Sequence, residues 1–83
     1  MNASISNTQE LKIFLEKAKV DKDYYSIYPD ENFYFDTVCY ICLKNKIWEI
    51  GTFERGLHHH VKQFSSEADG CQAFLEEFYP ETL

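Results

Sequence analysis

Apolar residues near the start of the chain recur at the spacing of an α-helix. They fall on one helical face, and the charged residues between them fall on the other. The apolar positions are Leu11, Phe14, Leu15 and Ala18. Ser6 or Asn7 is suited to cap this helix, because Gln9 and Glu10 stand three residues farther on, as in a capping box. The pattern therefore predicts a first helix that ends near Lys19.

Three later segments have the β-branched, aromatic and apolar character of strands. They are residues 37–43, 47–53 and 58–64. Residues 44–46 connect the first two segments through a loop of two or three residues, and residues 54–56 predict a three-residue loop with a bulge. The length of the first loop decides which sheet face Trp48 occupies, since a shift of one residue moves each side chain to the opposite face.

A second helix is predicted at the end of the chain. Ser65 or Ser66 caps it, and Pro80 marks its end. Its apolar stripe consists of Cys71, Phe74, Leu75 and Phe78. Gly70 costs this helix about 1 kcal/mol relative to alanine, so close packing is the expected reason for a glycine there.

The order of these elements predicts one α+β domain over residues 1–83. It consists of an N-terminal helix, a three-stranded antiparallel meander and a C-terminal helix packed on the sheet. The turn signal at residues 28–32 leaves space for an extra short edge strand. The first predicted strand has apolar side chains at both its odd and its even positions, which point to opposite faces. Both sheet faces are therefore expected to be at least partly covered. Either the two helices sandwich the sheet or one face binds a partner.

Charge is distributed unevenly along the chain, whose net charge is −6. Residues 21–36 sum to −4 and residues 64–83 to −5, whereas the segment between them is mildly basic. An acidic surface repels nucleic acid and speeds association with a cationic protein. We therefore expect a basic protein partner and no nucleic-acid binding, with solubility as the alternative role of the acidity.

The three cysteines, Cys39, Cys42 and Cys71, cannot all pair within the chain, and no stretch resembles a signal peptide or a membrane span. The sequence thus predicts a reduced, cytoplasmic protein without a membrane partner. Cys39 and Cys42 have CxxC spacing but fall within a predicted strand, where the odd offset points them to opposite faces. They are expected to be buried rather than to bind zinc or form a redox pair.

Candidate catalytic residues are sparse. His58, His59 and His60 are the only histidines, and no spacing points to further metal ligands, so an exposed polar strand is favoured over a metal site. Ser65 and Ser66 are explained as helix caps, and three glycines are too few for a phosphate-binding loop. We expect no enzyme activity, no cofactor, no metal and no small-molecule substrate.

Residues 21–36 combine six aromatic side chains with five carboxylates. A chain of this size cannot bury all of these rings while the acids stay in water, so part of the segment is expected to contact a partner. The predicted partner-binding residues are Asp21, Asp23, Tyr24, Tyr25, Tyr28, Asp30, Glu31, Tyr34 and Asp36. Core burial is the alternative for each ring, and it is favoured for Phe33, Phe35 and Trp48. The acids of the last helix are either a second contact zone or a solvated face; they are Glu67, Asp69, Glu76, Glu77 and Glu81.

Several short motifs recur in a known order. They are Trp48-Glu49-Ile50, the turn Glu54-Arg55-Gly56, and Phe64-Ser65-Ser66-Glu67-Ala68 followed by Cys71 and the pair Phe74-Leu75. In this order the chain resembles, over about residues 37–79, small immunity proteins of bacterial polymorphic-toxin and contact-dependent growth-inhibition systems. The residues before Thr37, the histidine run and Gly70 have no counterpart in that pattern.

The resemblance implies a cytoplasmic protein that binds and neutralises the C-terminal domain of a cognate toxin, commonly a nuclease. An RNA-cleaving toxin of the EndoU-like type is the first expectation from the resemblance. A nuclease carries basic residues for its phosphates, which agrees with the acidic and aromatic segment. The alternative is a small acidic regulatory or adaptor module, or an inhibitor that mimics nucleic acid.

Overall fold

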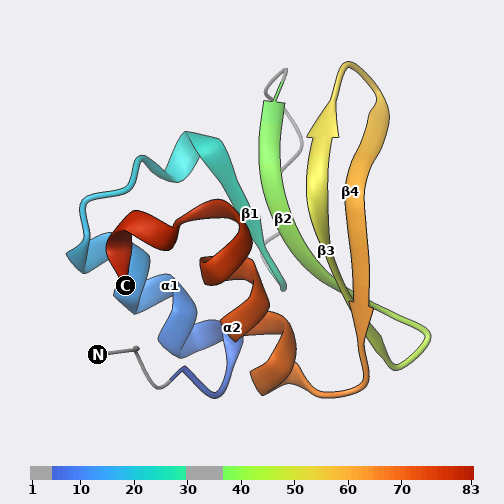
Figure 1. Ribbon diagram of the computed structural model, residues 1–83, viewed down its shortest axis with the longest axis horizontal. Coiled ribbons are helices and arrows are strands. Elements are labelled where there is room, and N and C mark those ends of the chain that lie inside the picture. The colour runs from blue at the N-terminus through green and yellow to red at the C-terminus, as the bar shows by residue number, and fades with distance from the viewer. Residues whose placement is uncertain (1–4, 30–36) are drawn as a thin grey trace.

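The computed structural model describes residues 5–29 and 37–83 of the chain. Its elements are α1 (Thr8–Lys17), η1 (Lys22–Tyr24), β1 (Tyr25–Ile27), β2 (Thr37–Lys44), β3 (Ile47–Glu54), β4 (Leu57–Phe64), α2 (Glu67–Phe78) and η2 (Pro80–Thr82). The predicted α+β class is confirmed, with two α-helices and one four-stranded sheet in the described residues (Figure 1).

The sheet has the strand order β1-β2-β3-β4. The three strands β2, β3 and β4 form the expected antiparallel meander. The extra edge strand is β1, which runs parallel to β2, with Tyr25 opposite Cys39 and Ile27 opposite Ile41. The sheet is therefore mixed rather than antiparallel throughout. The sequence of a three-residue strand does not show whether it pairs with its neighbour in the parallel or the antiparallel direction. That direction is set by the connection between the two strands.

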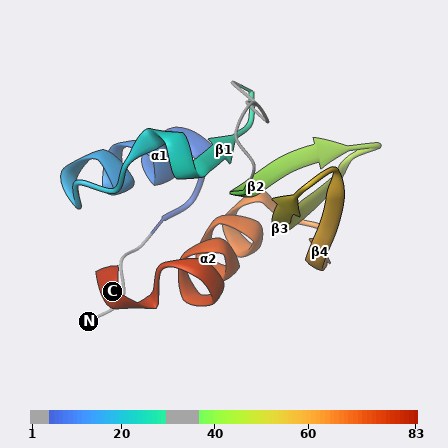
Figure 2. The ribbon, with the colours of Figure 1, turned by 90° about the horizontal axis from the view of Figure 1, so that it is seen from above.

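Helix α2 packs on one face of the sheet, and α1 packs against the same buried cluster from the outer edge of the sheet, so the predicted alternative of a sandwich is wrong. Figure 2 shows α2 beneath β2 and β3 and α1 beside β1, at the outer edge of the sheet. The buried cluster on this face consists of Leu11, Leu15, Tyr25, Ile27, Ile41, Trp48, Ile50, Cys71, Phe74, Leu75 and Tyr79. Trp48 thus belongs to the core. The side chains of β2 that point to the opposite face are buried as well, since Val38, Tyr40 and Cys42 are at most 3% exposed. The expectation that both faces are covered along this strand is therefore confirmed.

Both hairpin loops contain two residues with positive φ, as in the tight turns whose twist matches that of the strands. Asn45 (φ 50°) and Lys46 (φ 67°) join β2 to β3, and Arg55 (φ 51°) and Gly56 (φ 82°) join β3 to β4. The predicted three-residue loop at the second turn is therefore wrong. The irregularity lies farther along β4, where His60 has a φ of 54° and the register with β3 shifts.

Side chains hold the starts of both helices. The Asn7 side chain accepts a hydrogen bond from the Glu10 N–H at 2.8 Å, and the Ser66 hydroxyl accepts one from the Asp69 N–H at 3.1 Å. Helix α1 ends at Lys17, before the predicted Lys19, which has a φ of 61° and leaves the helical conformation.

Two acids of α2 make contacts within the protein. The Glu67 carboxylate accepts hydrogen bonds from the Thr8 N–H at 2.8 Å and the Thr8 hydroxyl at 3.2 Å, so it ties α2 to the start of α1. Glu77 forms an ion pair with Lys62 of β4 at 3.1 Å. The acids of α2 are therefore not simply a solvated face, because these two hold neighbouring elements.

Candidate functional site

The turn η1 ends in an exposed aromatic ring that follows two carboxylates, which are separated in the chain by Lys22. The Tyr24 side chain is 61% exposed, while Asp21 is exposed and Asp23 is half-buried. Asp21 closes the turn twice, because its carboxylate accepts from the Asp23 N–H at 2.9 Å and its carbonyl accepts from the Tyr24 N–H at 3.1 Å. The Tyr79 hydroxyl, 3.4 Å from the Tyr24 carbonyl oxygen, donates a long hydrogen bond to it. The backbone under the exposed ring is therefore fixed.

The other predicted partner-binding residues are distributed differently. Tyr25 is only 7% exposed and belongs to the core, so its assignment to an exposed contact surface is wrong. Strand alternation explains this, since Tyr25 and Ile27 share the face that the helices cover. Tyr28 is half-buried and packs edge-to-face on Trp48, with ring centroids 5.3 Å apart. Asp30, Glu31, Tyr34 and Asp36 lie outside the described residues, as do Phe33 and Phe35.

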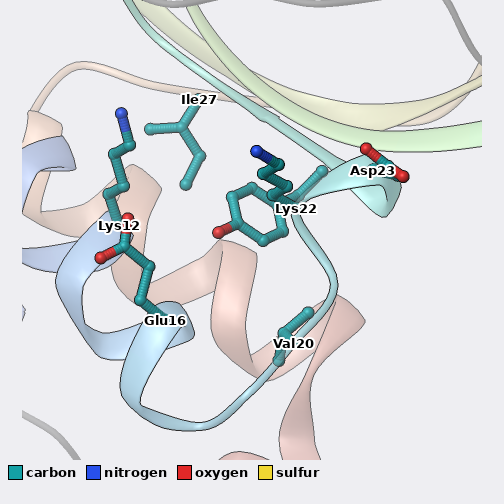
Figure 3. Close-up of a pocket in the computed structure, with 7 residues that line it drawn as sticks. Lys12, Glu16, Val20, Lys22, Asp23 and Ile27 are labelled. Carbon is teal, nitrogen blue, oxygen red and sulfur yellow. The ribbon is translucent and has the colours of Figure 1, made fainter.

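A groove runs between α1 and β1. It contains two adjoining hollows of about 550 and 430 Å³, and both are lined by Lys12, Glu16 and Ile27. The first hollow continues toward η1, and the second toward the start of α1 and Pro29. Figure 3 shows Lys12 and Glu16 rising from α1 on one side, with Ile27, Lys22 and Asp23 on the side of β1 and η1. This groove could not be predicted from the sequence, because it exists only when β1 joins the sheet beside α1.

Tyr25 lies in the wall of the first hollow. Burial raises the pKa of its hydroxyl, the charges of Glu16 and Asp21 raise it further, and that of Lys12 lowers it. The hydroxyl therefore stays protonated at neutral pH, and it can both donate and accept a hydrogen bond. It contributes polarity to the groove without contributing charge.

A chain of polar side chains lies on the sheet face that the helices do not cover. The Tyr40 hydroxyl donates to the Glu49 carboxylate at 2.8 Å, and Gln63 donates to the other carboxylate oxygen at 3.3 Å. Lys44 lies 3.5 Å from the same carboxylate. The nitrogen Nδ1 of His58 lies 3.0 Å from the Tyr40 oxygen. Because the single hydroxyl proton of Tyr40 is given to Glu49, the ring of His58 must donate to this oxygen.

The polar chain is suited to holding the sheet together rather than to catalysis. Burial raises the pKa of Tyr40 strongly, and the hydrogen bond and charge of Glu49 add to this effect. Burial alone would raise the pKa of Glu49, but the hydrogen bonds from Tyr40 and Gln63 and the charge of Lys44 outweigh it and lower the pKa. Neither group is then matched to proton transfer near neutral pH. The residues join β2, β3 and β4 in one register.

Glu49 should make the stability of the protein depend on acid. A carboxylate whose pKa is lower in the folded than in the unfolded chain stabilises the fold above its ordinary pKa of 4.5, and this contribution is lost as the pH falls below that value. In urea unfolding across this pH range, Glu49→Gln should therefore lose less stability on acidification than the wild type. Glu76→Gln, at an exposed position of α2, is the matched control. Parallel profiles for Glu49→Gln and the wild type would contradict the assignment.

The histidines and cysteines do not assemble a reactive centre. Within residues 5–29 and 37–83, no group of three or more His, Cys, Asp and Glu side chains is placed to hold a metal ion. All three cysteines are free thiols. Burial raises the pKa of Cys39, and it raises the pKa of Cys71 to about 12, so these two thiols are poor nucleophiles at neutral pH.

The described helices are also too short and polar to cross a bilayer, since none contains an apolar stretch of the required length. No protein-family model, no curated protein and no solved structure matches this chain.

Proposed function

We propose that this protein is a cytoplasmic immunity protein that binds a basic toxin domain and neutralises it without chemistry of its own. The observation that carries the proposal is the exposed ring of Tyr24, which follows Asp21 and Asp23 on a turn whose backbone is fixed. The resemblance in residues 37–79 gives the class of partner. An RNA-cleaving nuclease of the EndoU-like type is the first candidate.

A fixed turn favours binding because little conformational entropy is lost when the partner arrives. The ring of Tyr24 offers a large apolar area with a polar hydroxyl at its end, as at many binding hot spots. The carboxylates of Asp21 and Asp23 attract a cationic surface and raise the association rate. Together these three residues match what the active-site rim of a nuclease, rich in Lys and Arg, requires of an inhibitor.

The alternative of a nucleic-acid mimic is less well supported. Such an inhibitor needs carboxylates in rows with phosphate-like spacing, whereas several of the acids described here are bonded within the protein, Glu10 and Asp21 by backbone N–H groups close to them in the chain. Glu49 is held by Tyr40 and Gln63, Glu67 by Thr8, and Glu77 by Lys62. The patch of one ring and two acids is therefore better suited to binding a protein than to imitating the phosphate charges of a nucleic acid.

The test begins with the neighbouring gene. The proposal expects a large secreted protein with a variable C-terminal domain to be encoded immediately upstream. When that domain is produced in cells, it should stop growth, and co-production of this protein should restore growth. The two chains should co-purify in a stable complex. Growth arrest that this protein does not relieve, or complete separation of the chains on a sizing column, would overturn the proposal.

A further inference from the structure

Both backbone polar groups of Tyr24 are held by hydrogen bonds. Its N–H donates to the Asp21 carbonyl at 3.1 Å, and its carbonyl accepts from the Tyr79 hydroxyl at 3.4 Å. Each of these groups belongs to a planar peptide unit, so a bond to it restrains the orientation of the whole unit. The two units that flank the Tyr24 α-carbon set the direction in which the side chain leaves the backbone. The exposed ring then keeps only the rotations within its own side chain.

The two hydrogen bonds differ in where their partners come from. The bond to Asp21 lies within η1, so it moves with the turn when the turn shifts. The hydroxyl of Tyr79 comes from the end of α2, 55 residues farther along the chain than Tyr24. Tyr79 therefore relates the exposed ring to the core of the protein, to which it belongs itself.

Tyr79 is well suited to hold a neighbour, because its own backbone and ring are fixed. Its N–H donates to the Leu75 carbonyl at 2.9 Å, and its carbonyl accepts from the Thr82 hydroxyl at 2.6 Å. The ring is 9% exposed and packs on Phe74, with ring centroids 5.7 Å apart. A hydroxyl on a ring that is held in this way has little freedom to leave its acceptor.

The Tyr79 hydroxyl has a second neighbour, the thiol of Cys39 on β2, with which it forms a hydrogen bond. Burial raises the pKa of Tyr79, and the neighbouring Cys39 raises it further. The hydroxyl is therefore protonated at neutral pH and carries the proton that the Tyr24 carbonyl accepts. Because this single proton is directed to Tyr24, the Cys39 thiol supplies the proton of the other bond.

We infer that Tyr79 is a positioning residue for toxin binding, whose hydroxyl fixes the Tyr24 carbonyl and thereby the direction of the exposed ring. A ring that is held in its binding direction before the partner arrives loses less conformational freedom on binding than a ring that must first be ordered. Tyr79 is buried, so it acts through Tyr24 and not by contact with the toxin. The inference rests on the proposed function, which it deepens by naming a residue outside η1 that controls the affinity.

Tyr79→Phe removes the hydroxyl and keeps the buried ring, and its first effect is measured in the free protein by hydrogen exchange. We expect the amides of Asp23 and Tyr24 to exchange about threefold faster, the factor that a weak hydrogen bond contributes. The matched control is Tyr40→Phe, which deletes a hydroxyl that is bonded to Glu49 on the other sheet face. It should leave the exchange of these two amides unchanged. Wild-type exchange in Tyr79→Phe would overturn the inference.

Binding of the C-terminal domain of the secreted protein encoded upstream shows whether the hydroxyl acts through the exposed ring. Tyr79→Phe should weaken this binding about threefold in the wild-type background. It should have no further effect when Tyr24 is already alanine, because no ring is then left to direct. Equal weakening in both backgrounds would overturn the inference, since the hydroxyl would then act independently of Tyr24.

Failure of the proposed function gives a different result from failure of the inference. A wild-type protein that does not bind the toxin domain would overturn the proposed function and the inference with it. Unchanged amide exchange, in a protein that binds the toxin domain, would overturn the inference alone. The unfolding midpoints of Tyr79→Phe and Tyr40→Phe are measured beside the affinities. If the affinity fell with the midpoint in both variants alike, the effect would belong to stability, and the inference would be overturned.

Discussion

Replacing Gly51 with alanine should lower the free energy of unfolding by about 2 to 4 kcal/mol. A β-carbon at this position of β3 would lie 2.8 Å from the Tyr40 hydroxyl oxygen and 3.0 Å from both the Tyr40 ring and the His59 carbonyl oxygen. Tyr40 is fully buried and its hydroxyl is bonded to Glu49, so it cannot move aside without breaking that bond. Unfolding in urea, followed by the fluorescence of the only tryptophan, Trp48, measures the loss.

Gly70→Ala in α2 is the matched comparison, because it adds the same methyl group to the other buried glycine. The new β-carbon would lie 3.4 Å from the Ile41 side chain and 3.4 Å from the Trp48 β-carbon, which is ordinary van der Waals contact. Alanine also favours a helix interior by about 1 kcal/mol over glycine. We therefore expect Gly70→Ala to equal or exceed the wild type in stability. A Gly51→Ala variant as stable as Gly70→Ala would show that Tyr40 and its partners are not rigidly held.

Local sequence patterns were sufficient for the helices and for three of the four strands. The side-chain oxygens at Asn7 and Ser66 and the apolar spacing after them act within one or two turns, so they can be read without knowing the fold. Both two-residue loops contain residues that tolerate positive φ, yet the second loop was predicted one residue too long. The bulge was predicted at this turn, but it lies at His60. Its position depends on the pairing of two strands and not on the turn.

The candidate site was harder to predict because it depends on the position of β1. Tyr24 and Tyr25 are adjacent aromatic residues of the same type, and one lies in solvent and the other in the core because Tyr24 ends the turn η1 whereas Tyr25 begins the buried strand β1. The groove requires the same strand to lie beside α1. The polar chain around Glu49 was also not predicted. A carboxylate between the apolar residues Trp48 and Ile50 does indicate a charge that needs partners. A charged residue within an apolar strand is buried only with partners, and its partners come from two other strands.

Truncation of the exposed ring should have the largest effect on binding. Tyr24→Ala removes the aromatic anchor and is expected to raise the dissociation rate of the toxin complex about 30-fold, which corresponds to about 2 kcal/mol for a hot-spot residue. The stability of the free protein should hardly change, because the ring is 61% exposed and the turn is held by backbone and Asp21 contacts. Tyr24→Phe, which keeps the ring, should retain most of the affinity.

The two carboxylates beside the ring should act on a different rate. Asp21→Asn keeps an oxygen that can accept from the Asp23 N–H, so it removes charge without opening the turn. Combined with Asp23→Asn, it should slow association about tenfold at low salt and make the association rate less sensitive to ionic strength, while dissociation changes little. Surface-bound kinetics at several salt concentrations separate the two effects. If Tyr24→Ala and the double variant both kept wild-type rates while folded, η1 would lie outside the interface, and the acidic turn would serve solubility alone.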